Sequence, residues 1–211
     1  MREKNKYEVQ NDPARIGCFT ASSIYRAMRG AAGRATYVSE VATARRNDQF
    51  LRGGGNSAAT RWGDENEPVA LDLHEKACGQ KILDMPFVMH AWLPYFGASP
   101  DGLYEDYSKI IEVKCPYNGT YHTEVLRKGV DGIKPEYIAQ MTAQVLVYNS
   151  TLGITSCDFV CYDPDGKPPL EVVEFTPSDE QINDMTNLIF ALNAEVEQIN
   201  EEIEQRLKER K

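Results

Sequence analysis

The sequence lacks the cysteine and histidine spacing that a zinc or iron–sulfur site requires. Its five cysteines are scattered and include no Cys-x-x-Cys pair, and its three histidines stand alone. The segment CDFVC places Cys157 and Cys161 on one face of a predicted strand, where two small core residues are the simpler interpretation. We therefore expect free, reduced thiols and no cysteine-bound metal.

A long hydrophobic run is also missing. No stretch approaches the ~18 apolar residues of a membrane-spanning helix. The first ten residues, MREKNKYEVQ, contain no apolar segment typical of a signal peptide. We expect a cytoplasmic protein with no membrane partner.

Positive charge is in deficit, with 23 Lys and Arg against 32 Asp and Glu and a net charge of −9. Such a balance argues against broad binding of nucleic acid. The distribution is uneven, because residues 1–60 hold ten basic and five acidic side chains whereas residues 178–211 hold four and nine. This asymmetry predicts a local polyanion-binding face that includes Arg45, Arg46 and Arg52, with the acidic C-terminal segment directed away from it.

At 211 residues the chain has the size of one domain, which we place over residues 1–211. Residues 1–10 are polar and are expected to be flexible. Helical periodicity over residues 178–211 predicts a long C-terminal helix. Between these ends the pattern predicts three helices, three strands over residues 81–116, two helices and two strands. This order predicts an α/β fold with a mixed central β-sheet flanked by α-helices.

Two predicted helix starts bear on the function. Thr20 is the expected N-cap of a helix that carries Ser22 in its first turn. In ENEPVALDLHEKACG, Pro68 is expected in the first turn of a helix that ends near Gly79. Glu67 beside this proline would then be a first-turn acid that favours the helix dipole, which is the simpler interpretation from the residues alone.

The most informative stretch is GASPDGLYEDYSKIIEVKCP, residues 97–116, because it places charges inside an apolar strand. The two-residue period of a strand puts Glu112 and Lys114 on one face. Asp101 approaches Glu112 if the two strands on either side of the turn pair. Mg²⁺ takes carboxylates and a backbone carbonyl in such sites, and a neighbouring lysine orients water or stabilises developing charge. The alternative is a surface hairpin with an ordinary Glu–Lys pair.

These residues carry a resemblance. SPDG followed by IIEVKCP resembles the PD-(D/E)xK signature of restriction-endonuclease-like nucleases. Five ordered blocks, RIGCFTASSI, RWGDENEPVA, ASPDGL, EVKCP and YIAQMTAQVLV, resemble the phage lambda exonuclease family of viral alkaline-exonuclease-like recombination nucleases. The resemblance covers roughly residues 13–163 and implies a restriction-endonuclease-like core. The segment after Asp163 matches no pattern of the family.

The resemblance implies a role for each residue of the charged strand. Asp101 and Glu112 correspond to the carboxylates that bind the metal. Val113 corresponds to the residue whose carbonyl binds the metal, and Lys114 to the catalytic lysine.

Two further catalytic positions follow from the same resemblance. Glu67 matches a helix glutamate that completes the acidic site, and Gln140 matches a glutamine on the helix behind it. Glu65 and Gln144 stand near enough that either register is open. Without the resemblance, Gln140 would be read as a solvated helix position.

The resemblance also implies how the DNA end is bound. Arg15, Ser22 and Ser99 match an arginine and two serines near the 5′ phosphate. On the residues alone, Arg15 is equally well explained as an ordinary surface charge.

The function that the resemblance implies is a Mg²⁺-dependent exodeoxyribonuclease. It would digest one strand of linear double-stranded DNA from the 5′ end and leave a 3′ overhang for recombination by strand annealing. The resemblance further implies two Mg²⁺ ions per site, which Mn²⁺ can replace. It also implies a homotrimeric ring, a single-strand annealing protein as partner, and a phage or prophage origin in a bacterial cytoplasm. A sequence-specific endonuclease of this fold and a non-catalytic DNA-binding module remain as alternatives.

Overall fold

The computed structural model describes residues 12–51 and 57–210, so the predicted flexibility of residues 1–10 and the role of Arg52 lie outside the described residues. The elements in chain order are η1 Pro13–Arg15, β1 Phe19–Thr20, η2 Ala21–Ser23, α2 Tyr25–Met28, α3 Ala31–Asn47, α4 Ala58–Cys78, β2 Ile82–Leu83, β3 Val88–Met89, β4 Phe96–Ala98, β5 Gly102–Tyr104, β6 Ile110–Lys114, α5 Thr120–Lys128, η3 Gly129–Gly132, α6 Pro135–Leu152, β7 Cys157–Tyr162, β8 Leu170–Phe175 and α7 Asp179–Lys208.

A five-stranded mixed sheet organises the fold. Its strand order is β2-β5-β6-β7-β8, with β6 and β7 parallel and the other neighbours antiparallel. The parallel pair aligns Ile110 with Cys157 and Lys114 with Cys161. A smaller sheet of order β1-β4-β3 lies beside it. The mixed α/β architecture predicted from the sequence is confirmed.

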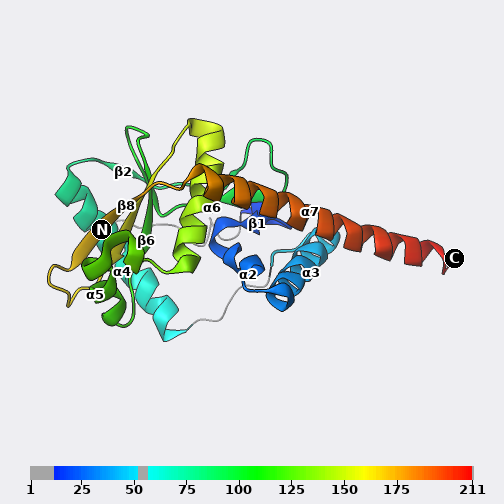
Figure 1. Ribbon diagram of the computed structural model, residues 1–211, viewed down its shortest axis with the longest axis horizontal. Coiled ribbons are helices and arrows are strands. Elements are labelled where there is room, and N and C mark those ends of the chain that lie inside the picture. Colours follow the sequence, from blue (N-terminus) through cyan, green and yellow to red (C-terminus); the bar gives the residue numbers. More distant parts are fainter. Residues whose placement is uncertain (1–11, 52–56, 211) are drawn as a thin grey trace.

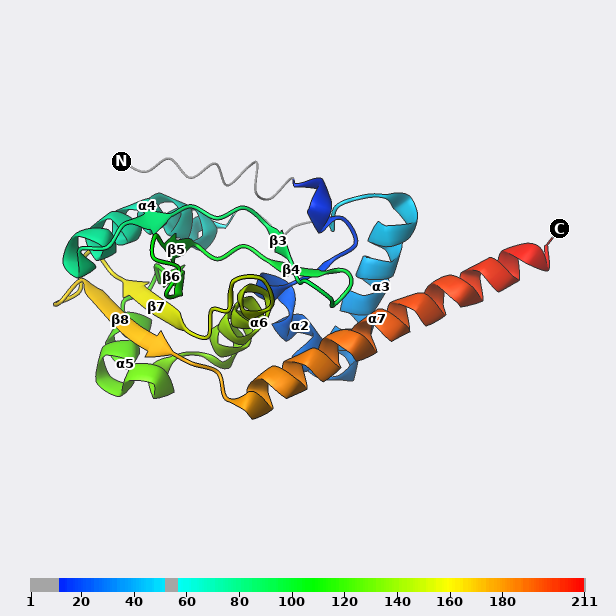
Figure 2. The ribbon, with the colours of Figure 1, turned by 90° about the horizontal axis from the view of Figure 1, so that it is seen from above.

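Helices cover both faces of the large sheet, with α4 on one side and α5 and α6 on the other (Figure 2). On the α4 face, Leu71 packs in one buried cluster with Ile111 and Val113. On the other face, Phe159 packs in the main core with Met141 of α6. Because successive strand residues point to opposite faces, both clusters draw on the same two central strands.

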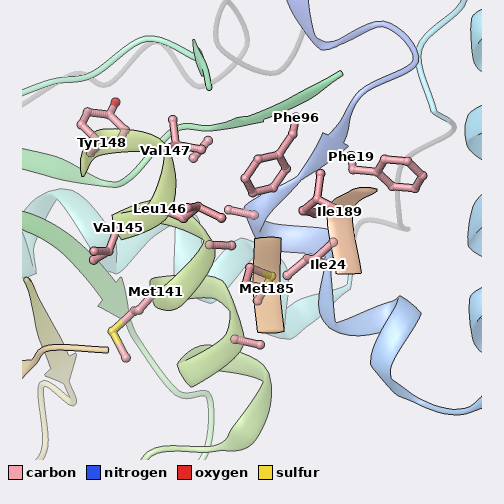
Figure 3. Close-up of a cluster of buried hydrophobic side chains, with 14 of the residues drawn as sticks. Phe19, Ile24, Phe96, Met141, Val145, Leu146, Val147, Tyr148, Met185 and Ile189 are labelled. Atoms are coloured by element: carbon pink, nitrogen blue, oxygen red, sulfur yellow. The ribbon is translucent and has the colours of Figure 1, made fainter. Parts of the chain in front are cut away.

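Helix α7 packs against the main core with its N-terminal half. Ser178 caps it in a capping box with Gln181, as the Ser-Asp-Glu start indicates. Its Met185 and Ile189 point toward Ile24 and the side chains of α6 (Figure 3). The C-terminal half of α7 extends beyond the rest of the molecule (Figure 1). Within the described residues, no helix combines the length and apolar content needed to cross a bilayer.

The predicted start of the Pro68 helix is wrong, and the predicted start at Thr20 is correct in position only. Helix α4 begins at Ala58, where Ser57 accepts a hydrogen bond from the Thr60 amide at 3.1 Å, so Pro68 lies inside the helix and not in its first turn. Glu67 is therefore no first-turn acid. Thr20 stands at the predicted N-cap position, but it makes no side-chain cap bond, and the segment after it is a single 3-10 turn followed by the four-residue α2.

Residues 81–116, for which the sequence pattern predicts three strands, form the five strands β2 to β6, and the stretch PYFGASPDGL contains two of them in different sheets. Strand β4 belongs to the small sheet and β5 to the large one. Ser99, Pro100 and Asp101 connect them, because a proline provides no amide hydrogen with which to continue a ladder. The chain therefore crosses from one sheet to the other just before Asp101.

The predicted separation of basic and acidic segments is also wrong. Helices α3 and α7 lie side by side, and Arg34 and Arg46 form ion pairs with Glu195 and Glu204. Arg45 is partly buried, donates to the Gly17 carbonyl at 2.8 Å and hydrogen-bonds Asn193. The opposite charges of the two segments attract each other inside one subunit. These arginines therefore bind α7 and are not presented as a DNA-binding face.

Candidate active site

Asp101 and the middle of β6 meet through backbone pairing. The Asp101 amide donates to the Ile111 carbonyl at 2.9 Å, and the Val113 amide donates to Asp101 Oδ2 at 2.8 Å. This antiparallel pairing of β5 with β6 is the one on which the sequence-based prediction depended. It fixes the Asp101 carboxylate beside the strand that carries Glu112.

Glu112 is buried and is the acceptor at the centre of the site. Its Oε2 accepts a hydrogen bond from Gln144 at 2.6 Å, and its Oε1 accepts one from Gln140 at 2.7 Å and one from Lys114. The two glutamines lie four residues apart on α6, so both project from one helix face. The geometry does not choose between Gln140 and Gln144, since both reach the same carboxylate.

Burial and neighbouring charges shift the pKa values of both Glu112 and Lys114. Burial, and after it the nearby Asp101 carboxylate, raise the pKa of Glu112 to about 7, against the opposing effect of Lys114. Burial alone would lower the pKa of Lys114, but Glu112 and Asp101 outweigh it and raise that pKa above its usual value. The ring of Tyr137, 5.0 Å from Lys114 Nζ, borders the ammonium group.

Glu67 reaches the site from the opposite helix layer. It is 8% exposed on α4, whereas Glu65 is exposed, which favours Glu67 over the alternative register. Burial, followed by the charges of Glu67 and Asp101, raises the pKa of Cys115 to about 12. Glu67 also lines one cavity with Lys114 and Cys115, at the end of β6.

The three residues expected near the DNA 5′ phosphate are only partly brought together. Arg15 Nη1 donates to Ser99 Oγ at 3.3 Å, and its guanidinium lies 4.6 Å from the centre of the Phe87 ring. Burial lowers the pKa of Arg15. The hydroxyl of Ser22 lies instead 3.4 Å from that of Thr20. Because η2 has only three residues, it lacks the aligned peptide dipoles with which the N-terminus of a longer helix attracts anions.

A cavity of about 670 Å³ adjoins the carboxylates, between α4, the end of β6, α5 and the start of α6. Glu67, Val113 and Lys114 line it. The volume falls within the range of small-molecule sites in proteins. Two of the predicted catalytic residues, Glu67 and Lys114, and the predicted metal-binding residue Val113 therefore lie at the wall of one cavity.

The donor set fits a hard divalent cation. Mg²⁺ binds through one or two carboxylates and keeps several waters. A carboxylate has about four acceptor positions, so the three donors to Glu112 leave one for a metal. Within the described residues, no group of three or more His, Cys, Asp or Glu side chains forms a ready metal cluster. The fit thus rests on Asp101, Glu112 and the neighbouring Val113 carbonyl, with water completing the coordination.

Sequence reasoning did not single out three residues of the cavity. Asp64 lines it one helical turn before Glu67, while Tyr117 and Lys134 lie on its walls. Asp64 could have been predicted to lie beside Glu67, because the two are i, i+3 neighbours on a helix. This required knowing that α4 begins before residue 64. No sequence signal marked the other two residues.

The chain matches the model of the YqaJ-like viral recombinase domain over residues 12–157. It is similar to the crystal structure of an alkaline exonuclease (LHK-Exo) from Laribacter hongkongensis, with 30% identity and a TM-score of 0.81 over 94% of this chain and 97% of that one. The same protein in complex with dAMP gives a TM-score of 0.82 at 30% identity over the same shares of the two chains.

A more distant structure shares the fold. A phage-related exonuclease from Haemophilus somnus 129PT has 15% identity and a TM-score of 0.66, covering 88% of this chain and 96% of that one. None of the curated proteins compared with this chain matches it. The family match and the 30% identity over almost the whole chain confirm the resemblance stated from the sequence. The chain belongs to the YqaJ-like viral recombinase domain family, the lambda exonuclease family.

Proposed function

We propose that the chain is a Mg²⁺-dependent exodeoxyribonuclease that acts on the ends of linear double-stranded DNA in the 5′-to-3′ direction. The observation that carries this proposal is the convergence of Asp101, Glu112 and Lys114 beside a 670 Å³ cavity. The similarity to LHK-Exo, an alkaline exonuclease whose structure with dAMP is known, supports a nuclease role on DNA. The product would be a duplex with a 3′ overhang, suited to recombination by strand annealing.

Each residue has a distinct task in this proposal. Asp101, Glu112 and the Val113 carbonyl hold the divalent cation, and Gln140 and Gln144 fix the orientation of Glu112. When bound, Mg²⁺ (with Mn²⁺ as a substitute, and with two ions in the full site) polarises the phosphodiester and lowers the pKa of a water.

The remaining catalytic tasks fall to Lys114 and Glu67. Lys114 stabilises the charge that develops on the phosphate. Glu67 adds a carboxylate from the α4 side of the site.

The DNA end is held at Arg15 and Ser99. A half-buried guanidinium stacked on Phe87 is pre-oriented, because its rotamers are restricted before the ligand arrives. Arginine engages phosphate oxygens in bidentate fashion. Ser22 belongs to the same proposed subsite, although its hydroxyl faces Thr20 in this structure.

The assembly and setting are proposals that rest on the family. We propose one nuclease domain over residues 1–211, a homotrimeric ring around DNA, a single-strand annealing partner, and the cytoplasm of a bacterium that carries a phage or prophage. The arginines of α3 do not support the ring, because Arg34 and Arg46 pair with α7. The sequence resemblance is its support.

Digestion of end-labelled linear duplex tests the function. Substrates with and without a 5′ phosphate are compared in Mg²⁺, Mn²⁺ and EDTA, with closed circular DNA as control. We expect metal-dependent loss of the 5′ label from linear DNA and no cleavage of the circle. Cleavage of the circle would identify an endonuclease, and an absence of metal-dependent hydrolysis would identify a non-catalytic module. Either result would overturn the proposal.

A further inference from the structure

An aromatic ring stands exposed at the rim of the cavity. Tyr117 follows the catalytic strand by three residues and is 65% exposed, more than any other large hydrophobic side chain in the described part of the chain. Its ring meets that of Trp62 on α4 edge to face, with centroids 5.9 Å apart and planes at 88°. This contact restricts the ring while leaving much of its surface open to the cavity that it lines.

A cation stands on another wall of the same cavity. Lys134 Nζ lies 4.6 Å from the ring centre of Tyr121 and 5.8 Å from that of Tyr137. Among the described residues it forms no ion pair with a carboxylate.

One of the three acids that line this cavity is neutralised by ion pairs. Glu124, which also lines the cavity, forms ion pairs with Arg127 at 3.0 Å and with Lys128 at 2.7 Å. The hollow thus offers one open aromatic face and one available ammonium group, the two features that recognise a nucleobase and a phosphate.

The position of Tyr117 in the same cavity as Lys114 indicates which nucleotide of the cleaved strand it would contact. In the proposed function, Arg15 and Ser99 hold the terminal phosphate, and Lys114 faces the phosphate that is cleaved. Among the described residues, the cavity lining includes Lys114 and Tyr117 but neither Arg15 nor Ser99. In the proposed function, the nucleotide on the 3′ side of the cleaved bond would then occupy the cavity that Lys114 and Tyr117 line.

We propose that Tyr117 stacks on the base of this second nucleotide and that Lys134 contacts the phosphate following it. The inference rests on the proposed function and adds a subsite to it. Stacking tolerates any base, because every base has a π face. A ring held by Trp62 would keep the strand in line for successive cleavages without imposing a sequence preference.

The test combines Tyr117 variants with abasic DNA. Single-turnover release of the 5′-terminal nucleotide is measured on a normal duplex, on one that is abasic at the second nucleotide of the cleaved strand, and on one that is abasic at the first. We expect Tyr117→Ala and Tyr117→Leu to slow cleavage of normal DNA roughly 10-fold, and Tyr117→Phe to retain the parent rate.

The inference is tested by how the effect of Tyr117→Ala differs among the three DNA substrates. On DNA that is abasic at the second nucleotide, parent and Tyr117→Ala should cleave at the same reduced rate, whereas on DNA abasic at the first nucleotide the 10-fold difference should persist. Tyr107→Asn is the matched control, because it removes another exposed tyrosine, at φ 61°, where asparagine is tolerated. An equal loss on all three substrates, or no loss at all, would overturn the inference. Failure of the parent to hydrolyse any duplex would instead overturn the proposed function.

Discussion

The side-chain amide of Gln144 donates a 2.6 Å hydrogen bond to Glu112 Oε2 from a position that is 1% exposed. A donor in this position holds a buried carboxylate in one orientation, and partners of this kind typically change metal affinity by about 10- to 100-fold when they are removed. We expect Gln144→Leu to weaken Mn²⁺ binding at least 10-fold by calorimetry, with a parallel loss of rate. Unchanged Mn²⁺ affinity in a folded variant would show that Glu112 does not need this donor.

Lys114 should be required for turnover and dispensable for folding. Lys114→Met keeps the apolar stem packed beside Tyr137 while removing the ammonium group. We expect the rate to fall about 10²- to 10⁴-fold, as when other groups that act in the transition state are removed. DNA binding in EDTA should persist. Lys81→Met, an exposed lysine paired with Glu105, is the control and should retain full activity.

The part of the site that could be predicted is the part encoded locally. Alternation along β6 correctly separates Glu112 from Val113, because a five-residue strand has only two faces. The approach of Asp101 to β6 required only one antiparallel pairing across a short turn. The i, i+4 spacing of Gln140 and Gln144 placed both on one helix face, although the residues alone did not favour either.

The errors have tertiary causes. The sequence pattern places Pro68 in the first turn of its helix, yet α4 begins at Ala58 and continues through Gly63, because its apolar face packs on the large sheet. The bond between Arg45 and Asn193 joins residues 148 positions apart, a distance over which charge counts carry no information. Charge counts therefore gave the correct sign of charge for each segment. They did not show that the basic helix α3 pairs with the acidic helix α7.

Arg15 should govern the preference for phosphorylated ends. We expect the parent to digest 5′-phosphorylated duplex faster than 5′-hydroxyl duplex, and Arg15→Ala to reduce that ratio roughly 10-fold, since a hydrogen bond between charged groups contributes about 1.5 to 3 kcal/mol. Arg26→Ala, which removes an arginine paired with Glu40, should leave the ratio unchanged. The assignment fails if the parent shows a preference and Arg15→Ala keeps it in full.

Arg45 should be a stability residue. Its guanidinium donates to the Gly17 carbonyl and to Asn193, and it lies 3.9 Å from the centre of the Tyr95 ring. Arg45→Met leaves these partners unsatisfied, so we expect a loss of about 2 to 4 kcal/mol in the free energy of unfolding by urea titration. Arg46→Met should cost less than about 1 kcal/mol, because its pair with Glu204 is largely exposed. Similar losses in the two variants would contradict this distinction.

His74 should make stability depend on pH through a buried network. Its Nε2 lies 2.6 Å from the hydroxyl of Tyr104, which donates to Asp158 Oδ2 at 2.6 Å, while Lys109 donates to Oδ1 at 3.0 Å. Since the tyrosine hydroxyl donates its hydrogen to Asp158, it accepts from His74, which is consistent with a neutral ring protonated at Nε2.

Burial lowers the pKa of His74, against the attraction of Asp158. The unfolded chain therefore binds this proton at a higher pH than the folded chain does, and stability falls as the pH drops below about 6.5, the unperturbed histidine value. One such proton changes the free energy of unfolding by at most about 1.4 kcal/mol per pH unit. Urea titrations at pH 7.5 and 5.5 should show a smaller loss of stability on acidification in His74→Gln than in the parent. Equal losses in the two proteins would mean that His74 is protonated alike in the folded and unfolded states.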